Sequence, residues 1–325
     1  MTIKSSIVKV TEHIAQSKGK TRFSFEILPP LKGQHIDSIF NNIDPLMEFN
    51  PPFIDVTYHR EEYVYQELDN GLLKKKIVKK RPGTVGICAA IQNKYNVDAI
   101  PHVLCGGFSK EDTENFLIDL DFLGIDNVMA LRGDAVKSEI YFKPEKDGHK
   151  FANELVDQIE NLNQGKYLDK DLQNTSCTDF CVGVAGYPEK HMEAPSLESD
   201  IHFLKKKIKQ GADYIVTQMF FDNQKYFEFV EKCKSEGITV PIIPGLKPIS
   251  TKKQLNLIPH RFKVDLPDDL VMAVVKAKDN TEVRQIGIEW CIAQSKELIK
   301  KGVPFLHYYS MGKSDNIKSI ASEIF

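Results

Sequence analysis

The sequence predicts a (β/α)8 TIM barrel, a closed parallel sheet of eight strands that alternate with helices. Three observations predict it: eight short runs rich in β-branched and aromatic residues, amphipathic stretches of helical period between them, and a length of 325 residues that one barrel domain can occupy. A doubly wound open sheet has the same alternation and is the alternative. We expect a single domain over residues 1–325.

Each expected strand is a short apolar run bounded by polar or turn-forming residues. The strands are 22–28, 53–59, 97–105, 127–133, 181–187, 214–221, 241–249 and 304–311. The clearest helical patterns are 84–95, 109–123, 151–163, 196–210, 224–236, 251–260, 268–278 and 281–301. We also expect an N-terminal helix within residues 1–20, and a surface excursion at the polar, aperiodic segment 160–180.

Several helix boundaries carry their own signals. Ser109, Ser196 and the pair Ser250-Thr251 stand where an N-cap hydroxyl is expected. Glycines follow the last periodic residue of four helices, where a left-handed residue commonly ends a helix. They are Gly124, Gly211, Gly237 and Gly302.

Composition and cysteine usage narrow the class of protein. The chain has 43 basic and 45 acidic residues, a net charge of −2, so it has no strong attraction for nucleic acid or an anionic membrane. No apolar run approaches the roughly 20 residues that span a bilayer, and the N-terminus has no apolar signal region. Cys177 and Cys181 could pair or bind a metal, but no second cluster supports a metal site. We expect a cytoplasmic protein with reduced thiols and no metal.

Polar residues stand at the ends of seven expected strands. The carboxyl ends of barrel strands form one rim that carries the active site, so we expect these residues to lie together. They are Glu26, Thr57, Tyr58, His59, His102, Arg132, Gly133, Asp134, Tyr187, Gln218, Tyr308 and Tyr309.

Glu26 is the most informative of these residues. The alternation in Phe23-Ser24-Phe25-Glu26-Ile27 places Ser24 and Glu26 on one face of the strand, which we expect to face the barrel interior. A carboxylate with apolar neighbours at a barrel mouth tends to have a raised pKa and can act as a general acid near neutral pH. A structural carboxylate, bonded to a neighbouring backbone group or lysine, is the alternative.

The tripeptide Arg132-Gly133-Asp134 allows three interpretations. An exposed cell-adhesion motif would need export, for which the chain shows no signal. An ion pair between Arg132 and Asp134 is a purely structural alternative. At a strand end, a guanidinium fork, a glycine that permits close approach and a carboxylate suit a phosphate-bearing or heteroaromatic ligand.

Residues 184–191 indicate a further part of a ligand site. Ala185 leaves room for a flat ring, Tyr187 can stack on it, and His191 with Lys207 could neutralise a diphosphate. Lys207 ends a run of three lysines, which on a helix is also typical of a solvated face.

The chain contains no G-x-G-x-x-G turn after a strand, no P-loop, no H-E-x-x-H and no G-x-S-x-G. The absence of these motifs disfavours a Rossmann dinucleotide site, triphosphate hydrolysis, zinc proteolysis and serine hydrolysis.

With these residues in view, the chain resembles the methylenetetrahydrofolate reductase family, FAD-dependent TIM-barrel enzymes of one-carbon metabolism. The matching pieces occur in family order between residues 23 and 309. They are Ser24-Phe25-Glu26 with Pro29-Pro30, Asp55 to Tyr58, Pro101-His102, Ala130 to Asp134, Val184 to His191 with Glu193-Ala194, Gly211 to Asp213, Thr217 to Asp222, Pro244 to Ile249, and His307 to Tyr309.

The resemblance implies NAD(P)H-driven reduction of 5,10-methylenetetrahydrofolate to 5-methyltetrahydrofolate, with hydride transfer through N5 of non-covalent FAD in a ping-pong scheme. It implies Glu26 as proton donor and Asp134 as the carboxylate between flavin and pterin. The implied FAD contacts are Thr57, Tyr58, His102, Leu131, Arg132, Gly133, Asp134, Phe151, Ala152, Ala185, Tyr187, His191, Ala194, Asp200 and Lys207. The implied substrate contacts are Gln218, Gln254, Tyr309 and Lys313.

Some features depart from the family or remain open. Phe151 stands where a tyrosine is common, Lys313 replaces an arginine, and Ala135-Val136 follow Asp134 where the family has a proline nearby.

Bacterial relatives are commonly homo-oligomers, so we expect this protein to form a homo-oligomer. The chain has no room after its last strand for the S-adenosylmethionine-binding domain of eukaryotic relatives, so we expect no effect of S-adenosylmethionine. Another barrel flavin oxidoreductase, proline-dehydrogenase-like, and a non-catalytic folate- or flavin-binding protein are the rival functions.

Overall fold

The computed structural model describes residues 8–136, 139, 141–310 and 312–325, and these residues form the expected (β/α)8 barrel. The sheet is parallel and contains, in chain order, β1 (Arg22–Ile27), β2 (Phe53–Val56), β5 (Asp98–Leu104), β6 (Asn127–Leu131), β7 (Cys181–Gly186), β8 (Tyr214–Thr217), β9 (Ile242–Ile243), β10 (Gly245–Leu246) and β11 (Phe305–Tyr309). β9 pairs with β8, and β10 pairs with β11. The segment 242–246 therefore acts as the seventh of eight barrel strands and closes the sheet, which rules out the open-sheet alternative.

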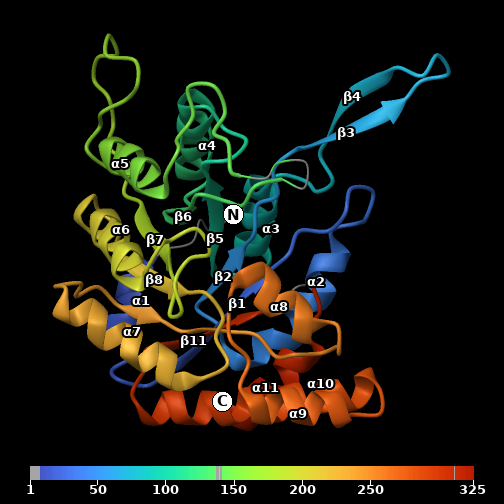
Figure 1. Ribbon diagram of the computed structural model, residues 1–325. Helices are drawn as coiled ribbons and strands as arrows, with labels where there is room; N and C mark the ends of the chain where they lie inside the picture. Colours follow the sequence, from blue (N-terminus) through green and yellow to red (C-terminus); the bar gives the residue numbers. More distant parts are fainter. Residues whose placement is uncertain (1–7, 137–138, 140, 311) are drawn as a thin grey trace.

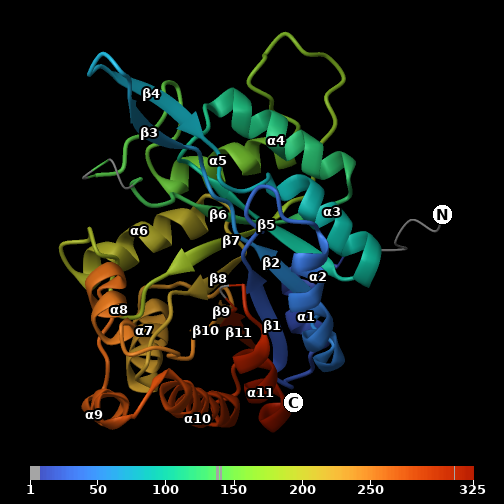
Figure 2. The ribbon, with the colours of Figure 1, turned by 90° about the vertical axis from the view of Figure 1, so that its right-hand side faces the viewer.

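Helices surround the sheet (Figures 1 and 2). They are α2 (Asp37–Ile43), the 3-10 helix η1 (Asp44–Phe49), α3 (Thr84–Tyr95), α4 (Lys110–Phe122), α5 (Ala152–Asn163), α6 (Leu197–Lys209), α7 (Asn223–Ser235), α8 (Gln254–Phe262), α9 (Asp268–Lys276), α10 (Asn280–Lys300) and α11 (Asp315–Ile324). The apolar residues of β1, Phe23, Phe25 and Ile27, pack outward into the core shared with these helices. Ser24 and Glu26 consequently face the barrel interior, as the alternation predicted.

The expected strands were too long at several ends. The strands expected at 53–59 and 214–221 end at Val56 and Thr217, and the residues that follow lie outside the sheet. The strand expected at 241–249 is interrupted at Pro244, whose carbonyl still accepts a hydrogen bond from His307 N (3.1 Å). The end of the strand expected at 304–311 falls on Met311, which lies outside the described residues.

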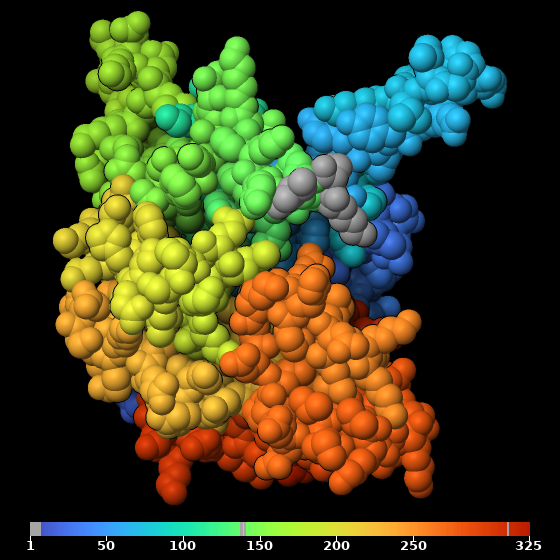
Figure 3. Space-filling model, in the orientation of Figure 1, coloured from blue at the N-terminus to red at the C-terminus, as the bar shows by residue number. Residues whose placement is uncertain are grey.

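An antiparallel hairpin, absent from the sequence-based expectation, follows β2. It consists of β3 (Glu62–Glu67) and β4 (Leu73–Val78) and stands out from the body of the molecule (Figures 1 and 3). Most of its side chains are exposed. No clear sequence pattern marks this hairpin, because the run of three lysines in β4 hides the alternation that is typical of a strand. Helices α2 and α11 and η1 were not expected either.

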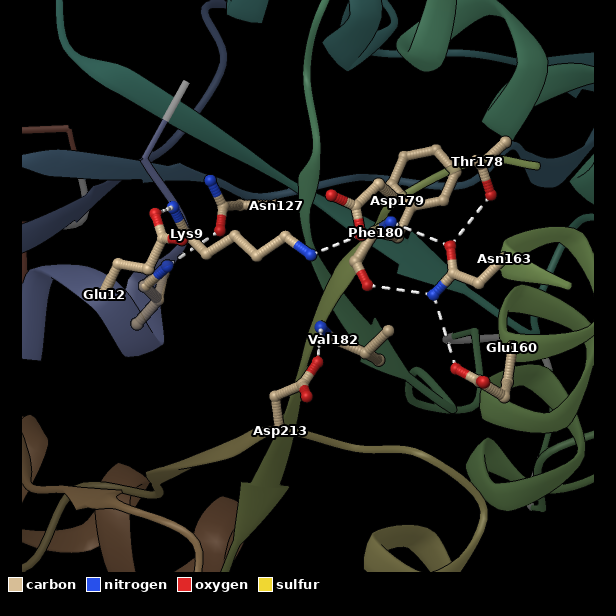
Figure 4. A network of polar contacts seen from close by, with 11 residues as sticks. Lys9, Glu12, Asn127, Glu160, Asn163, Thr178, Asp179, Phe180, Val182 and Asp213 are labelled. Atoms are coloured by element: carbon tan, nitrogen blue, oxygen red, sulfur yellow. Dashed lines mark hydrogen bonds and ion pairs between the residues drawn. The ribbon is translucent and has the colours of Figure 1, made fainter. Parts of the chain in front are cut away.

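The N-terminal segment closes the amino end of the barrel. Its helix α1 covers only Val10–Gln16, so the expected helix within 1–20 is shorter, and residues 1–7 lie outside the described part. Val10 N donates to Asn127 Oδ1 (2.9 Å), and Asn127 Nδ2 donates to the Val8 carbonyl (3.1 Å). Figure 4 shows Asn127 near the pairing of Lys9 with Asp179. With this end covered, the carboxyl end of the barrel is where a ligand can enter.

The surface excursion expected at 160–180 is a loop whose two ends are tied together. Residues 160–163 still belong to α5, and the loop follows. Asn163 Nδ2 donates to the Phe180 carbonyl (3.0 Å), and Thr178 Oγ1 donates to Asn163 Oδ1 (2.8 Å), as Figure 4 shows. The excursion is therefore anchored at its base and leaves the entry into β7 fixed.

Most of the helix boundary signals are confirmed. Ser109 and Ser196 accept hydrogen bonds from the third residue of their helices, at 3.1 and 3.2 Å. The four helix-ending glycines all have positive φ, from 64° to 116°. The signal at Ser250-Thr251 was wrong, because α8 begins at Gln254 and the side chain of Gln254 accepts from the backbone of both residues.

Among the described residues, no helix is long and apolar enough to cross a membrane. The six cysteines are free; Cys177 is exposed and Cys181 is buried. Within the same part of the chain, no group of three or more His, Cys, Asp or Glu side chains could hold a metal ion.

One glycine fixes how α10 packs on the chain beyond β10. A Cβ at Gly287 would lie 1.9 Å from the carbonyl oxygen of Ile249, and a buried backbone cannot move aside cheaply. We expect Gly287→Ala to lower the free energy of unfolding by about 2–4 kcal/mol in urea denaturation. Gly86→Ala in the interior of α3, where a Cβ meets nothing within 4 Å, should be neutral or stabilising by up to about 1 kcal/mol. Equal effects of the two substitutions would contradict the packing argument.

Candidate active site

Side chains from four neighbouring strands form one row across the inside of the barrel mouth. Glu26 on β1 lies opposite Asp55 on β2 and opposite Tyr309 on β11. The pairing of β10 with β11, continued by one residue, places Lys247 opposite Tyr309. We call Lys247, Tyr309, Glu26 and Asp55 the mouth row. Because side chains alternate along each strand, all four point to the same side of the sheet.

Glu26 combines burial with a specific partner. Only 12% of its side chain is exposed, and its Oε2 lies 3.4 Å from His102 Nε2. Burial raises the pKa of Glu26 to about 7 and the charge of Asp55 adds to this, whereas the charges of His102 and Lys247 oppose it. Among the described residues, its carboxyl group makes no hydrogen bond to backbone or lysine, which the structural alternative would require. Glu26 can therefore hold a transferable proton near neutral pH.

His102 lies between two carboxylates. Its Nε2 is 3.7 Å from Asp55 Oδ2 as well as 3.4 Å from Glu26. Burial opposes a charge on the imidazole, but a hydrogen bond that His102 donates to the Asp55 carboxylate, together with the charges of Glu26 and Asp55, outweighs it and raises the pKa of His102. Asp55, only 2% exposed, thus holds His102 in place, and His102 in turn faces Glu26.

A second layer of polar groups lies just below the mouth row. Ser24 Oγ is 3.0 Å from His307 Nδ1, and the His307 ring stacks on Phe53 with centroids 6.4 Å apart. Burial lowers the pKa of His307. Further down, apolar side chains fill the barrel, among them Tyr214 and Met129. A separate buried pair, His13 Nε2 and Asp98 Oδ2 at 2.7 Å, lies at the amino end of the barrel, beyond these apolar side chains.

Beside the mouth row, the ends of β6 and β7 present a group of charged and aromatic residues. Arg132 Nη1 donates to Glu193 Oε2 (2.5 Å), so the ion pair considered between Arg132 and Asp134 is not formed. The Tyr187 ring meets His191 edge to face, with centroids 4.8 Å apart. These contacts make a polar wall with one aromatic face.

The start of α6 supports this wall from behind. His191 N donates to Asp200 Oδ2 (2.7 Å), and Lys207 Nζ donates to the Ala185 carbonyl at the end of β7 (2.7 Å). Burial lowers the pKa of Lys207 to about 8, and the charge of Asp200 opposes this shift. Of the three lysines in the run, Lys207 is thus held inward, whereas the Lys205 ammonium pairs with Glu236 at the surface.

The remaining predicted cofactor residues lie at the same carboxyl ends or at helix starts. Thr57 follows β2 and has a buried Oγ1 without a hydrogen-bond partner in the described chain. The exposed Asp134 follows Gly133, whose φ is +82°. Phe151 precedes α5 and stacks on Phe203 of α6 (6.5 Å, 21°). Among the others, the Tyr58 ring packs on Phe108. Leu131 is the last residue of β6, and Ala152 is the first residue of α5. The backbone N–H of Ala194 donates a hydrogen bond to the His191 carbonyl.

The four predicted substrate residues divide into two pairs. Tyr309 OH donates to the Thr217 carbonyl (2.6 Å), directly before Gln218, so these two predicted residues are neighbours at the mouth. The Gln254 side chain is occupied at the start of α8. Lys313 is exposed between β11 and α11. The described contacts do not connect this second pair with the first.

The sequence-based list included one wrong residue and missed three. Tyr308 points outward, and its OH lies 2.8 Å from Ser295 Oγ on α10. Asp55, Lys247 and His307 belong to the site but were not singled out. A signal existed for Lys247, because the seventh expected strand was the only one without a polar residue assigned to the rim. Side chains two positions apart on a strand lie on the same face. Asp55 is two residues before Thr57, and His307 is two residues before Tyr309, so the alternation would have placed both inside the barrel.

The fold and the site together define an α/β barrel whose mouth joins an acid–base group to a polar wall with one aromatic face. The model of the family "Methylenetetrahydrofolate reductase" matches residues 9–324. The chain therefore belongs to the methylenetetrahydrofolate reductase family.

Relatives with this name are found in bacteria, fungi and plants. The chain is 32% identical over 321 residues to methylenetetrahydrofolate reductase (NADH) 1 of Arabidopsis thaliana, covering 96% of the chain and 48% of the relative. It is 31% identical to methylenetetrahydrofolate reductase 1 of Schizosaccharomyces pombe, of which it covers 46%. With 5,10-methylenetetrahydrofolate reductase of Escherichia coli it shares 29% identity over 94% of the chain and 91% of the relative. The chain thus spans about half the length of the plant and yeast relatives and most of the bacterial one.

One solved structure has the same architecture. It is a protein from Clostridium thermocellum that binds two copies of 5-methyl-5,6,7,8-tetrahydrofolic acid, with a TM-score of 0.55 over 96% of the chain and 98% of that protein. At 14% sequence identity, this likeness shows the barrel fold alone.

Proposed function

We propose that the protein reduces 5,10-methylenetetrahydrofolate to 5-methyltetrahydrofolate with electrons from NAD(P)H and a non-covalent FAD. Family membership supports the reaction. The observation that carries it is Glu26, a nearly buried carboxyl group at the barrel mouth with a pKa of about 7 and His102 beside it. Relatives are named for NADH in plants and NADPH in Caenorhabditis elegans, so the choice between the two donors stays open.

The residues of the polar wall fit FAD in chemical character. Arg132 and Lys207 supply positive charge for a diphosphate, and Tyr187 offers a ring face. Burial lowers the pKa of His191, so His191 offers a ring N–H donor. The unpartnered buried hydroxyl of Thr57 is a free donor and acceptor at the same rim. Bound there, FAD would supply a two-electron carrier that takes a hydride from NAD(P)H and passes one from N5 to the folate methylene carbon.

The chain's own part in this chemistry is proton transfer and positioning. Opening the folate's five-membered ring requires a proton on the departing amine nitrogen, and Glu26 is the group at the mouth that can give it. His102, held by Asp55, faces Glu26 and completes an acid–base group shielded from bulk water. We propose that Gln218 and Tyr309 contact the substrate at the mouth, and that Gln254 and Lys313 contribute at its outer end.

The pH dependence of the two half-reactions should differ. The acid form of Glu26 is lost as pH rises through about 7, so the folate half-reaction should slow by up to tenfold per pH unit above that value. Reduction of the flavin by NAD(P)H gives no proton to a leaving nitrogen, so its rate should not fall in this way above pH 7. Single-turnover rates of each half-reaction between pH 6 and 9 test this, and identical profiles would contradict it.

The experiment that tests the function is product analysis after reconstitution. Purified protein is incubated with FAD, then with NADH or NADPH and methylenetetrahydrofolate, and 5-methyltetrahydrofolate is measured by mass spectrometry. Turnover supports the proposal. Flavin reduction by proline in place of NAD(P)H would favour the proline-dehydrogenase-like alternative. Binding of flavin or folate without turnover would favour the non-catalytic one.

A further inference from the structure

Lys247 enters the candidate site from the seventh barrel strand. It directly follows β10, whose two residues pair with His307 and Tyr308, and Pro248 follows it. Leu246 is buried among the outward-facing core residues, so alternation turns Lys247 toward the barrel interior. Gly287 of α10, packed against Ile249, fixes the chain just beyond. The lysine is therefore held at the mouth by the strand before it and the helix behind it.

In the mouth row, Lys247 and Glu26 are separated only by Tyr309. Neighbouring strands lie about 4.8 Å apart, so the two Cα atoms are about 10 Å apart, a span that the long lysine and glutamate side chains largely bridge. Within the described chain, the Lys247 ammonium has no hydrogen bond and no ion pair within 4 Å. Its charge acts on Glu26, and burial lowers the pKa of Lys247 to about 8, against the opposing effect of Glu26. Lys247 is half-buried, so its ammonium group stands at the mouth without a direct partner and its charge can act on Glu26 across the mouth row.

The charged and titratable groups that face Glu26 come from four sides. Asp55 on β2 carries a negative charge, His102 on β5 a positive one when protonated, and Lys247 beyond β10 a positive one. Tyr309 and His307 on β11 complete the set. His307 is buried and Tyr309 half-buried: burial raises the pKa of Tyr309 and lowers that of His307, so both are neutral near pH 7. Besides His102, Lys247 is therefore the group that favours the ionised form of Glu26.

We propose that Lys247 is a positioning residue for Glu26, and that its ammonium group in the mouth row lowers the pH up to which Glu26 can donate a proton. The proposal rests on the proposed function only in what that proton is used for. If the positive charge were removed, burial and Asp55 would act on Glu26 with less opposition. Glu26 would then keep its proton to a higher pH. Since the effect is electrostatic, it depends on the charge of residue 247 and hardly on its shape.

The direct test is an NMR titration of the protein without added cofactor. The protein is labelled with 13C at the glutamate carboxyl groups, and the Glu26 signal is assigned by its loss in Glu26→Gln. We expect Lys247→Met to raise the titration midpoint of Glu26 by about one pH unit, and Lys247→Arg to leave it within about 0.3 unit. Lys253→Met, an exposed lysine before α8, should leave it unchanged. An unmoved midpoint in Lys247→Met, or an equal shift in Lys253→Met, would overturn the proposal.

The kinetic readout separates this proposal from the proposed function. In Lys247→Met the alkaline limb of the folate half-reaction should move up by the same one pH unit, while the rate of flavin reduction by NAD(P)H keeps its pH profile. If the wild-type protein reduces no folate, the proposed function fails, and the NMR titration still decides the effect of Lys247 on Glu26. Lys247→Gln provides a second neutral variant if circular dichroism shows that Lys247→Met does not fold. The same midpoint shift is expected of it, and no shift would overturn the proposal.

Discussion

Glu26→Gln is expected to keep its FAD, to be reduced by NAD(P)H at a rate within about tenfold of wild type, and to lose folate reduction by at least about 10²-fold. Glutamine keeps the shape and hydrogen bonding of Glu26 but has no proton to give to the departing amine nitrogen. In the structure Glu26 is nearly buried, at a pKa of about 7, with His102 as its closest charged contact. Stopped-flow absorbance of the flavin, run separately with each substrate, measures both half-reactions.

The matched control is Glu236→Gln, whose exposed carboxylate pairs with Lys205 on the surface at the carboxyl end of α7. It should leave both half-reactions unchanged. Equal losses in the two half-reactions of Glu26→Gln would assign Glu26 to the architecture of the mouth. An intact folate half-reaction would show that another group is the acid.

Asp134→Asn should raise the reduction potential of the bound flavin and slow folate reduction by about tenfold or more. A negative charge beside a flavin disfavours its electron-rich reduced form, and the two carboxylate oxygens can accept from the adjacent N–H groups of a pterin. Asp134 is exposed, follows Gly133 at the end of β6, and makes no ion pair with Arg132, which binds Glu193 instead. Its carboxylate is therefore free to face ligands. Spectroelectrochemistry and single-turnover folate kinetics measure the two effects.

Asp169→Asn, in the exposed loop after α5, removes the same charge away from the site and serves as control. An unmoved potential together with intact folate reduction in Asp134→Asn would show that Asp134 is structural. The same change in potential in both variants would assign the effect to net charge alone.

The sequence predicted the barrel because most local signals agreed with the global fold. Ser24 and Glu26 could be placed inside from the alternation of β1 alone, and the glycine ends of four helices were confirmed by their positive φ. Most of the rim residues were found for the same reason, since a parallel barrel brings every strand end to one side. Local sequence patterns were therefore sufficient to predict the rim residues that the barrel fold itself brings close together.

Contacts between distant residues could not be predicted in this way. That His102 meets Glu26 and Asp55, or that Arg132 meets Glu193 in place of Asp134, depends on register and loop paths that no local pattern contains. Tyr308 was assigned to the rim because two tyrosines end the strand, and only the register shows that it points outward. The hairpin of β3 and β4 was missed because it contributes little to the core, whose periodicity is the main signal in a sequence.

The most direct test of the proposed function is a sequential anaerobic stopped-flow experiment on the wild-type protein reconstituted with FAD. NADH or NADPH should bleach the oxidised flavin absorbance, and methylenetetrahydrofolate added to the reduced protein should restore it, with one 5-methyltetrahydrofolate formed per flavin reoxidised. Absence of flavin binding, or a reduced flavin that methylenetetrahydrofolate does not reoxidise, would contradict the account.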